Sequence, residues 1–131
     1  LAGAVYDFVR DELVHTNETA GLYRNGERID RAALGGPSSL STGIPAATRS
    51  NAEAAAKNAE SLNAWGKVRM IGSAALSLSW VAQGKLDGYK ETGIRWWDVA
   101  GGLALVRASG GNFTVANDDI WSPLEVSANG R

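Results

Sequence analysis

Two short apolar segments, each following a strand-like stretch and ending at glycine, constrain the fold of this chain more than any other feature. Residues 74–83 are apolar at nearly every position, follow Gly72-Ser73 and stop at Gly84. Residues 97–109 form a second such segment, which stops at Gly110-Gly111. A helix that is hydrophobic all round is a buried one, and glycine commonly ends a helix at its C′ position. The sequence therefore predicts two buried helices.

Strand and helix signals alternate around these two segments. Residues 67–71, 86–91, 112–116 and 124–128 are rich in strand-forming side chains, whereas residues 51–62 are rich in alanine and contain no Gly or Pro. We predict a helix over 51–62, with Ser50 or Asn51 as its N-cap. Strands that alternate with helices favour helices layered on a mixed sheet. The predicted fold class is α/β, in the form of a layered α+β structure.

The first third of the chain consists of strands and turns. Strand-like stretches include residues 4–9 and 12–16, and Asn25-Gly26 separates residues 21–24 from 27–29. Asn-Gly is the strongest short hairpin signal, so we predict an antiparallel meander of three or four strands. A loop over 30–37 and another strand over 38–44, closed by Gly43 and Pro45, would follow. We assign residues 1–45 to this meander in a central sheet region and residues 46–131 to an α/β region.

Composition excludes several classes of protein. The 131 residues suffice for one domain with a real core, and 13 Lys and Arg balance 14 Asp and Glu. No basic surface for nucleic acid and no polybasic run for an anionic membrane is indicated. The apolar stretches are too short to span a bilayer. The chain has no Cys, which fits a reducing compartment. We expect a cytoplasmic protein with neither nucleic acid nor membrane as partner.

Few residue patterns in the chain carry obvious chemistry. A nucleophile elbow, a Walker loop and a His pair are all missing, and the one histidine, His15, lies in a predicted strand as an ordinary sheet position. Asp98 lies near the start of the second buried helix, where the helix dipole favours a charged carboxylate. It is either a plain N-cap or a ligand for a hard cation such as Mg²⁺. Ser73 poses the same choice between helix cap and ligand-binding group, and Glu91 by spacing alone is a solvated strand end.

Several motifs in order resemble one family. Gly72-Ser-Ala-Ala75, Leu86-Asp-Gly-Tyr89 and Trp97-Asp-Val-Ala-Gly-Gly102 follow one another, and Ser41-Thr-Gly-Ile-Pro45 precedes them. Together they resemble the C-terminal part of inositol monophosphatases, whose hallmark is W-D-x-A-(A/G)-G, within the Mg²⁺-dependent, lithium-sensitive phosphatase superfamily. The resemblance covers essentially the whole chain. An ordered series of spaced motifs is far more specific than any one of them.

The resemblance implies a fold, an activity and a set of site residues. The chain would be the C-terminal part of an αβαβα sandwich with a mixed sheet. Asp98 would be a ligand of the catalytic Mg²⁺, Glu91 would hydrogen-bond substrate hydroxyls, and Gly72, Ser73 and Ala74 would line the substrate pocket. The substrate would be inositol monophosphate or a similar polyol or sugar phosphate, hydrolysed by metal-activated water. Family members also pair as homodimers. The aromatic pair Trp96-Trp97 is expected to pack around the site.

The chain also departs from the family pattern. The family carries a metal-binding glutamate and a D-P-(I/L)-D-G-T motif that supply the other Mg²⁺ ligands, and neither is present in this sequence. Two-metal phosphate hydrolysis needs more ligands than Asp98. We therefore interpret the chain as one fragment of a larger phosphatase fold that lacks its N-terminal half, and inactive when alone. The alternatives are the same fold acting on fructose bisphosphate, histidinol phosphate or a nucleotide bisphosphate, or a non-catalytic fragment or binding module.

Overall fold

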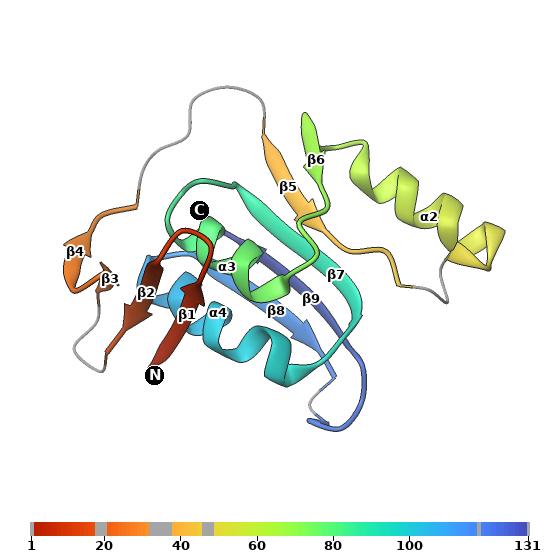
Figure 1. Ribbon diagram of the computed structural model, residues 1–131. Helices are drawn as coiled ribbons and strands as arrows, with labels where there is room; N and C mark the ends of the chain where they lie inside the picture. The colour runs from red at the N-terminus through yellow and green to blue at the C-terminus, as the bar shows by residue number, and fades with distance from the viewer. Residues whose placement is uncertain (1, 18–20, 32–37, 46–48, 118, 131) are drawn as a thin grey trace.

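The computed structural model describes residues 2–17, 21–31, 38–45, 49–117 and 119–130 (Figure 1). Most of the loop predicted over residues 30–37 lies outside these ranges. Within the described residues the strands form two separate sheets, one of four strands and one of five. All helices and strands below are given with their observed bounds.

The first sheet is the predicted antiparallel meander. Its strands are β1 (Gly3–Asp7), β2 (Glu12–Thr16), β3 (Leu22–Arg24) and β4 (Glu27–Ile29), in that order. Asn25 and Gly26 form the tight turn between β3 and β4 with φ of 50° and 85°, the left-handed geometry that a two-residue hairpin requires. His15 lies in β2 and stacks on the ring of Tyr23 in β3, with 5.3 Å between ring centroids. The histidine is thus an ordinary sheet residue, as predicted.

The second sheet is mixed. Its order is β6 (Lys67–Arg69), β5 (Ser39–Thr42), β7 (Gly88–Ile94), β9 (Leu124–Asn129) and β8 (Asn112–Ala116). Strand β5 runs parallel to both β6 and β7, and the other pairs are antiparallel. The strand predicted over 38–44 therefore lies in this sheet and not beside the meander. All four residues of β5 are buried, as expected for a strand covered on both faces.

Three helices are seen among the described residues: α2 (Ala52–Leu62), α3 (Ala74–Ala82) and α4 (Trp96–Ala108). Asn51 caps α2 by accepting the N–H of Ala54 at 3.1 Å. Gly84 follows α3 with φ of 75°, so the predicted glycine stop is confirmed. None of these helices is long and apolar enough to cross a bilayer.

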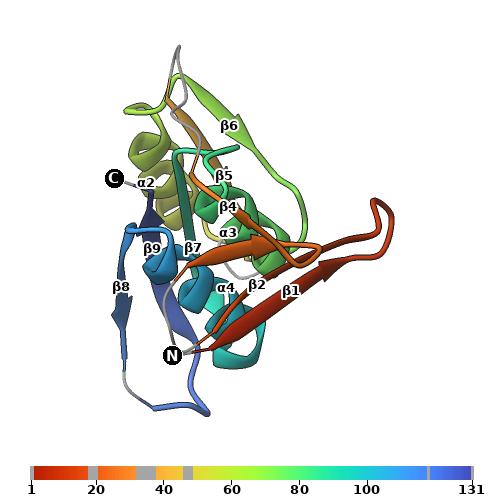
Figure 2. The same cartoon turned by 90° about the vertical axis from the view of Figure 1, so that its left-hand side faces the viewer.

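Helices α3 and α4 form a layer between the two sheets (Figure 2). Strand side chains alternate between faces, so Tyr89 and Glu91 of β7 face this helical layer, whereas Lys90 and Thr92 face the opposite side. Lys90 and Thr92 share a surface pocket with residues of α2. The order of layers is therefore small sheet, α3 with α4, large sheet, and α2. This order confirms the predicted layered fold with a mixed sheet.

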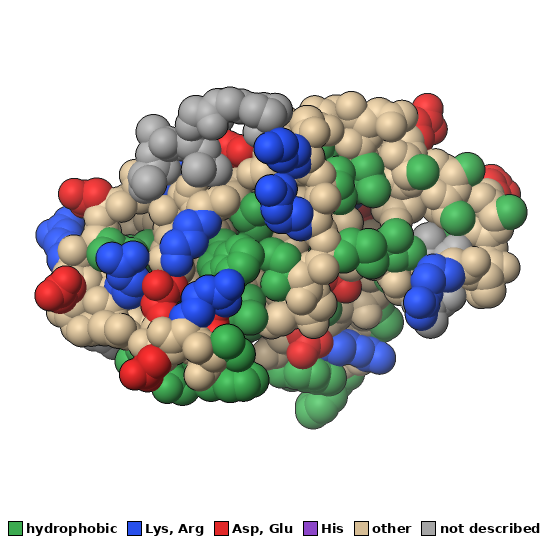
Figure 3. Space-filling view, turned by 45° about the horizontal axis from the view of Figure 1, so that its top comes forward, with side chains coloured by type: hydrophobic (Ala, Val, Ile, Leu, Met, Phe, Trp, Pro, Cys, Tyr) green, Lys and Arg blue, Asp and Glu red, His purple; other side chains and the backbone are tan. Residues whose placement is uncertain are grey.

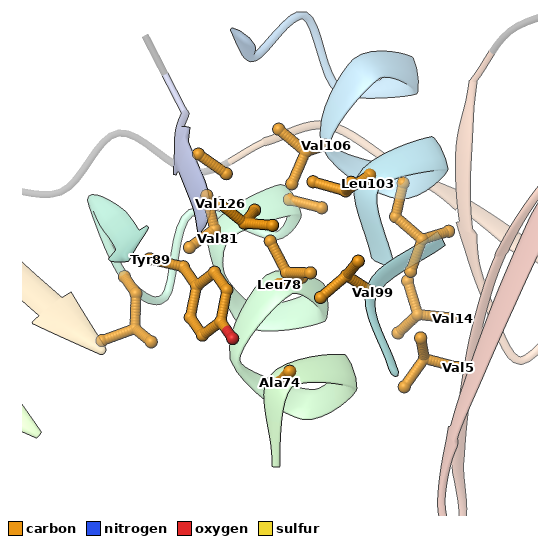
Figure 4. Packing of buried hydrophobic residues seen from close by; sticks show 14 of the residues in the cluster. Val5, Val14, Ala74, Leu78, Val81, Tyr89, Val99, Leu103, Val106 and Val126 are labelled. Carbon is orange, nitrogen blue, oxygen red and sulfur yellow. The ribbon is translucent and has the colours of Figure 1, made fainter. Parts of the chain in front are cut away.

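The core lies where α3 crosses α4. Leu78 is fully buried between Tyr89 and Val126 of the large sheet and Val99 of α4 (Figure 4). Gly102 of α4 faces Leu78, and a Cβ added at this glycine would lie 2.5 Å from the Leu78 Cβ. The last glycine of the W-D-V-A-G-G motif thus permits close contact between the two helices.

The surface mixes charge with exposed apolar side chains. On the face shown in Figure 3, basic and acidic side chains are interspersed and hydrophobic side chains reach the surface between them. Among the residues that the structure describes, Phe8 and Val9 are the most exposed large apolar side chains, at 81% and 77%. Both lie in the turn that follows β1. This turn is held by polar contacts and not by burial of its apolar residues.

Asp7 organises the turn that joins β1 to β2. Its Oδ1 accepts the backbone N–H groups of Val9 and Arg10 at 3.0 and 3.2 Å, and its Oδ2 accepts Nη1 of Arg10 at 2.8 Å. The Arg10 guanidinium also lies over the ring of Trp80 on α3. The side-chain hydrogen bond from Arg10 holds the pKa of the Asp7 carboxyl below its ordinary value, although burial opposes this shift.

We expect Asp7→Asn to flatten the acid dependence of stability. A carboxyl whose pKa is lowered by folding stabilises the protein above its unfolded pKa of about 3.9, and this contribution disappears as the pH falls through the folded pKa. The free energy of unfolding, measured in urea from pH 6 to pH 3, should therefore fall less steeply for Asp7→Asn than for the wild type. Asp30→Asn, at an exposed position, is the control and should keep the wild-type slope. Equal slopes for Asp7→Asn and wild type would contradict the assignment.

Candidate active site

A pocket of about 410 Å³ opens at the carboxyl ends of the parallel strands β5, β6 and β7. In open α/β sheets this edge is where ligands bind, because the helices that follow the strands begin there. The volume is that of a small-molecule site. Its walls are formed by Thr42, Gly43, Gly72, Ser73, Ala74, Ala75, Ser77, Glu91, Ile94, Trp97 and Asp98.

Gly72 and Ser73 make the turn from β6 into α3. Gly72 has φ of 79°, a conformation that favours glycine. Ser73 is the N-cap of α3, and its Oγ accepts the N–H of Leu76 at 3.3 Å. Of the two roles considered for Ser73 from the sequence, helix capping is therefore observed. Capping uses the hydroxyl as an acceptor, so its proton is available to a ligand in the pocket.

Two buried hydroxyls support this turn from below. The Oγ of Ser77 donates to the carbonyl of Ser73 at 2.7 Å, and the hydroxyls of Ser77 and Ser41 lie 2.8 Å apart. Because the Ser77 proton is used on Ser73, Ser41 is the donor to Ser77. Ser41 is completely buried in β5. This chain of hydrogen bonds ties the start of α3 to the interior strand β5 of the large sheet.

Asp98 is in the first turn of α4 but is not its N-cap. The helix begins one residue earlier than predicted, at Trp96, and its N-cap is Arg95, which makes no side-chain capping bond. The plain N-cap interpretation of Asp98 is therefore wrong. Within the described part of the chain, no side chain hydrogen-bonds its exposed carboxylate. The carboxylate lines the pocket next to the positive end of the helix dipole.

Glu91 lies within β7 and not at its end. The hydroxyl of Tyr89 donates to Glu91 Oε2 at 2.8 Å. A Cβ added at Gly43 would overlap both carboxylate oxygens, so the Glu91 carboxylate rests against the backbone of the Thr-Gly-Ile-Pro turn. Burial, the hydrogen bond to Glu91 and the charges of Glu91 and Asp98 raise the pKa of the Tyr89 hydroxyl far above its ordinary value.

The pocket fits one part of a divalent-cation site. Asp98 offers a free carboxylate of the kind that Mg²⁺ prefers. Within the described ranges, no three acidic or histidine side chains come together as a complete metal site. Asp98 is thus suited to be a single protein ligand, with other ligands needed from elsewhere.

The structure places all five predicted site residues, Gly72, Ser73, Ala74, Glu91 and Asp98, on this one pocket. Pocket residues that we did not predict include Thr42, Gly43 and Ser77. The Thr-Gly-Ile-Pro motif was the available signal for the first two. Of the aromatic pair expected to pack around the site, Trp97 lines the pocket and is 64% exposed, whereas Trp96 packs against the core.

Comparison with known proteins decides the relationship. The family model described as "Inositol monophosphatase family" matches residues 1–130. The chain belongs to this family.

Relatives of this inositol monophosphatase family member have two kinds of name. "Inositol-1-monophosphatase" of Mesorhizobium japonicum is 36% identical over 115 residues, which cover 85% of this chain and 43% of the relative. "Nus factor SuhB" of Escherichia coli K12 is 39% identical over 134 residues, which cover 97% of this chain and 50% of the relative. The chain therefore spans about half the length of the curated relatives it matches.

Solved structures agree with the fold. The inositol monophosphatase from Anabaena (Nostoc) sp. PCC 7120 superposes with a TM-score of 0.82 at 32% sequence identity. The match covers 98% of this chain and 55% of the Anabaena chain. The arrangement of α3, α4 and the two sheets is thus that of one half of an inositol monophosphatase fold.

Proposed function

We propose that this chain is the C-terminal part of a Mg²⁺-dependent phosphomonoesterase that acts on inositol monophosphate or a similar polyol phosphate. The single observation that carries the proposal is the pocket at the carboxyl ends of β5, β6 and β7. It brings two carboxylates, Glu91 and Asp98, together with the starts of two helices. Free backbone N–H groups at helix starts favour a phosphate, and carboxylates favour a cation and hydroxyl groups.

Each pocket residue has a proposed role. The N–H groups at the start of α3, with the hydroxyl of Ser73, hold the phosphate oxygens, and Gly72 and Ala74 leave room for the ester to approach. Glu91 accepts hydrogen bonds from hydroxyls of the polyol. Asp98 holds Mg²⁺, which when bound supplies positive charge to the phosphate and lowers the pKa of water. The remaining ligands would come from a part of the protein outside this chain.

The names of some relatives, but not of all, support a polyol phosphate as the substrate. The Mesorhizobium and Anabaena proteins are named as inositol monophosphatases, whereas the Escherichia coli relative is named as a Nus factor. Glu91 favours a substrate rich in hydroxyl groups over one without them. From the resemblance we also propose a homodimer in the cytoplasm.

We expect the isolated 131-residue chain to hydrolyse phosphomonoesters negligibly, and the protein completed with the N-terminal family segment to be active only with Mg²⁺. One aspartate cannot supply the ligands that two-metal hydrolysis requires. Release of inorganic phosphate from inositol 1-phosphate is measured for both proteins, with Mg²⁺ and with excess chelator.

Two outcomes would contradict the proposal in different ways. Robust Mg²⁺-dependent turnover by the isolated chain, with its mass confirmed, would refute the need for the missing segment. An inactive completed protein that folds and binds Mg²⁺ would favour the alternative of a non-catalytic binding module.

Light scattering on the same samples tests the homodimer.

A further inference from the structure

We propose that Tyr89 is a positioning residue for substrate selection. It holds the Glu91 carboxylate against Gly43, so that the carboxylate is already in place to accept hydrogen bonds from a polyol. This inference rests on the proposed function and adds to it. The residues come from separate motifs, since Gly43 belongs to the Thr-Gly-Ile-Pro turn and Tyr89 to Leu-Asp-Gly-Tyr. Neither residue was singled out from the sequence as part of the site.

Strand geometry makes the contact between Tyr89 and Glu91 possible. Residues two apart in a strand point to the same face, so both side chains project from β7 toward the helical layer. Tyr89 is only 1% exposed and packs in the core. Its hydroxyl points toward the end of α3 that carries Ala74, at the edge of the core (Figure 4). The tyrosine thus connects the rigid interior with the pocket.

The Glu91 carboxylate is held from two sides. Tyr89 donates to Oε2 at 2.8 Å, and the carboxylate occupies the space that a side chain at position 43 would need. One oxygen therefore has a fixed donor, while Oε1 keeps its lone pairs for other donors. A carboxylate has about four acceptor sites, so acceptance from Tyr89 leaves capacity for two neighbouring hydroxyls of a polyol.

Tyr89 is the donor in this pair. Burial and the nearby carboxylates raise the pKa of the Tyr89 hydroxyl above its ordinary value of about 10, so the phenol keeps its proton at neutral pH. A glutamate that is already fixed before the substrate arrives loses less side-chain freedom on binding. The advantage applies to substrates whose hydroxyls bind Glu91, and not to phosphate esters that lack them.

The test uses the completed protein of the previous section with Mg²⁺. The measured quantity is the ratio of kcat/KM for inositol 1-phosphate to kcat/KM for p-nitrophenyl phosphate, which has no alcohol hydroxyls. Glu91→Gln should lower this ratio about tenfold, because a hydrogen bond to a charged acceptor is stronger than one to a neutral acceptor. Tyr89→Phe should lower the ratio by a similar or smaller factor. The effect should appear as a higher KM for inositol 1-phosphate, and kcat for p-nitrophenyl phosphate should stay at its wild-type value.

A double variant distinguishes positioning from general damage. If Tyr89 acts through Glu91, the ratio for Tyr89→Phe combined with Glu91→Gln should equal that of Glu91→Gln alone. Gly43→Ala tests the other side of the carboxylate and should also lower the ratio. Tyr23→Phe is the matched control, since Tyr23 lies in the small sheet away from the pocket, and it should leave the ratio unchanged.

The outcomes separate this inference from the proposed function. An active wild type whose ratio falls with Glu91→Gln but not with Tyr89→Phe would overturn the role of Tyr89 alone. Losses that multiply in the double variant would also overturn it, since they would mean independent effects. A wild type inactive on both esters in Mg²⁺ would overturn the proposed function and this inference with it. Thermal unfolding of each variant shows whether a change in ratio accompanies a change in stability.

Discussion

Asp98→Asn should lower kcat of the completed, Mg²⁺-dependent protein by at least about a hundredfold. Asparagine keeps the size of the side chain but removes the negative charge that would hold the cation. Stabilisation by a bound metal is worth several kcal/mol, and each ~1.4 kcal/mol is tenfold in rate. Stability should change little, because Arg95 and not Asp98 is the N-cap of α4. Phosphate release at saturating substrate and thermal unfolding measure the two effects.

The control for this variant is Asp30→Asn, an exposed aspartate outside the pocket. It removes the same charge from the protein as a whole and should retain wild-type kcat. Near-normal turnover of Asp98→Asn at ordinary Mg²⁺ concentrations would show that Asp98 holds no catalytic metal. A large loss of thermal stability with kcat retained would show that Asp98 serves the fold and not the reaction.

Gly102→Val should lower the free energy of unfolding by about 3 kcal/mol. A Cβ at this position would lie 2.5 Å from the Leu78 Cβ, closer than packed carbon atoms can approach, and valine adds two methyl groups to it. Helices α3 and α4 would have to separate at the centre of the core. A loss of this size is a large part of the ~5–15 kcal/mol that stabilises a typical domain. Unfolding in urea measures it.

The matched control is Ala100→Val, which introduces the same side chain on the exposed side of α4. It should cost less than about 1 kcal/mol, which is the scale of intrinsic helix propensity. Gly102→Val should also reduce activity, since Ser73 caps α3 and α4 carries Asp98. A Gly102→Val protein as stable as Ala100→Val would mean that the core has room where the structure shows none.

Local signals in the sequence were enough to predict most helices and strands. Residues 74–83 and 97–109 are mostly apolar, and such a segment favours a helix packed in the core. Asn25-Gly26 specifies its turn because few residues tolerate the left-handed backbone found there. These features depend on neighbours within a few residues, so they can be inferred without knowledge of the tertiary structure.

Pairings between distant residues could not be predicted in this way. From its sequence, strand β5 was assigned to the meander, but it pairs with β6 and β7. Nothing in its four residues indicates either partner. The start of α4 at Trp96 also decided that Asp98 is not a cap. One residue's difference in the position of a helix start changes which side chain can reach the free N–H groups.

The candidate site also combines features that the sequence could predict with features that depend on tertiary contacts. The five residues Gly72, Ser73, Ala74, Glu91 and Asp98 could be selected from the sequence, because their motifs occur in a fixed order with fixed spacing. The contacts of Glu91 with Tyr89 and Gly43 could not, since the Gly43 contact joins strands that meet only in the folded sheet. Residue types and spacing thus determined which chemistry the chain can offer. Only the packing of β5 against β7 decided how the Glu91 carboxylate is held, because its position against Gly43 depends on a long-range contact.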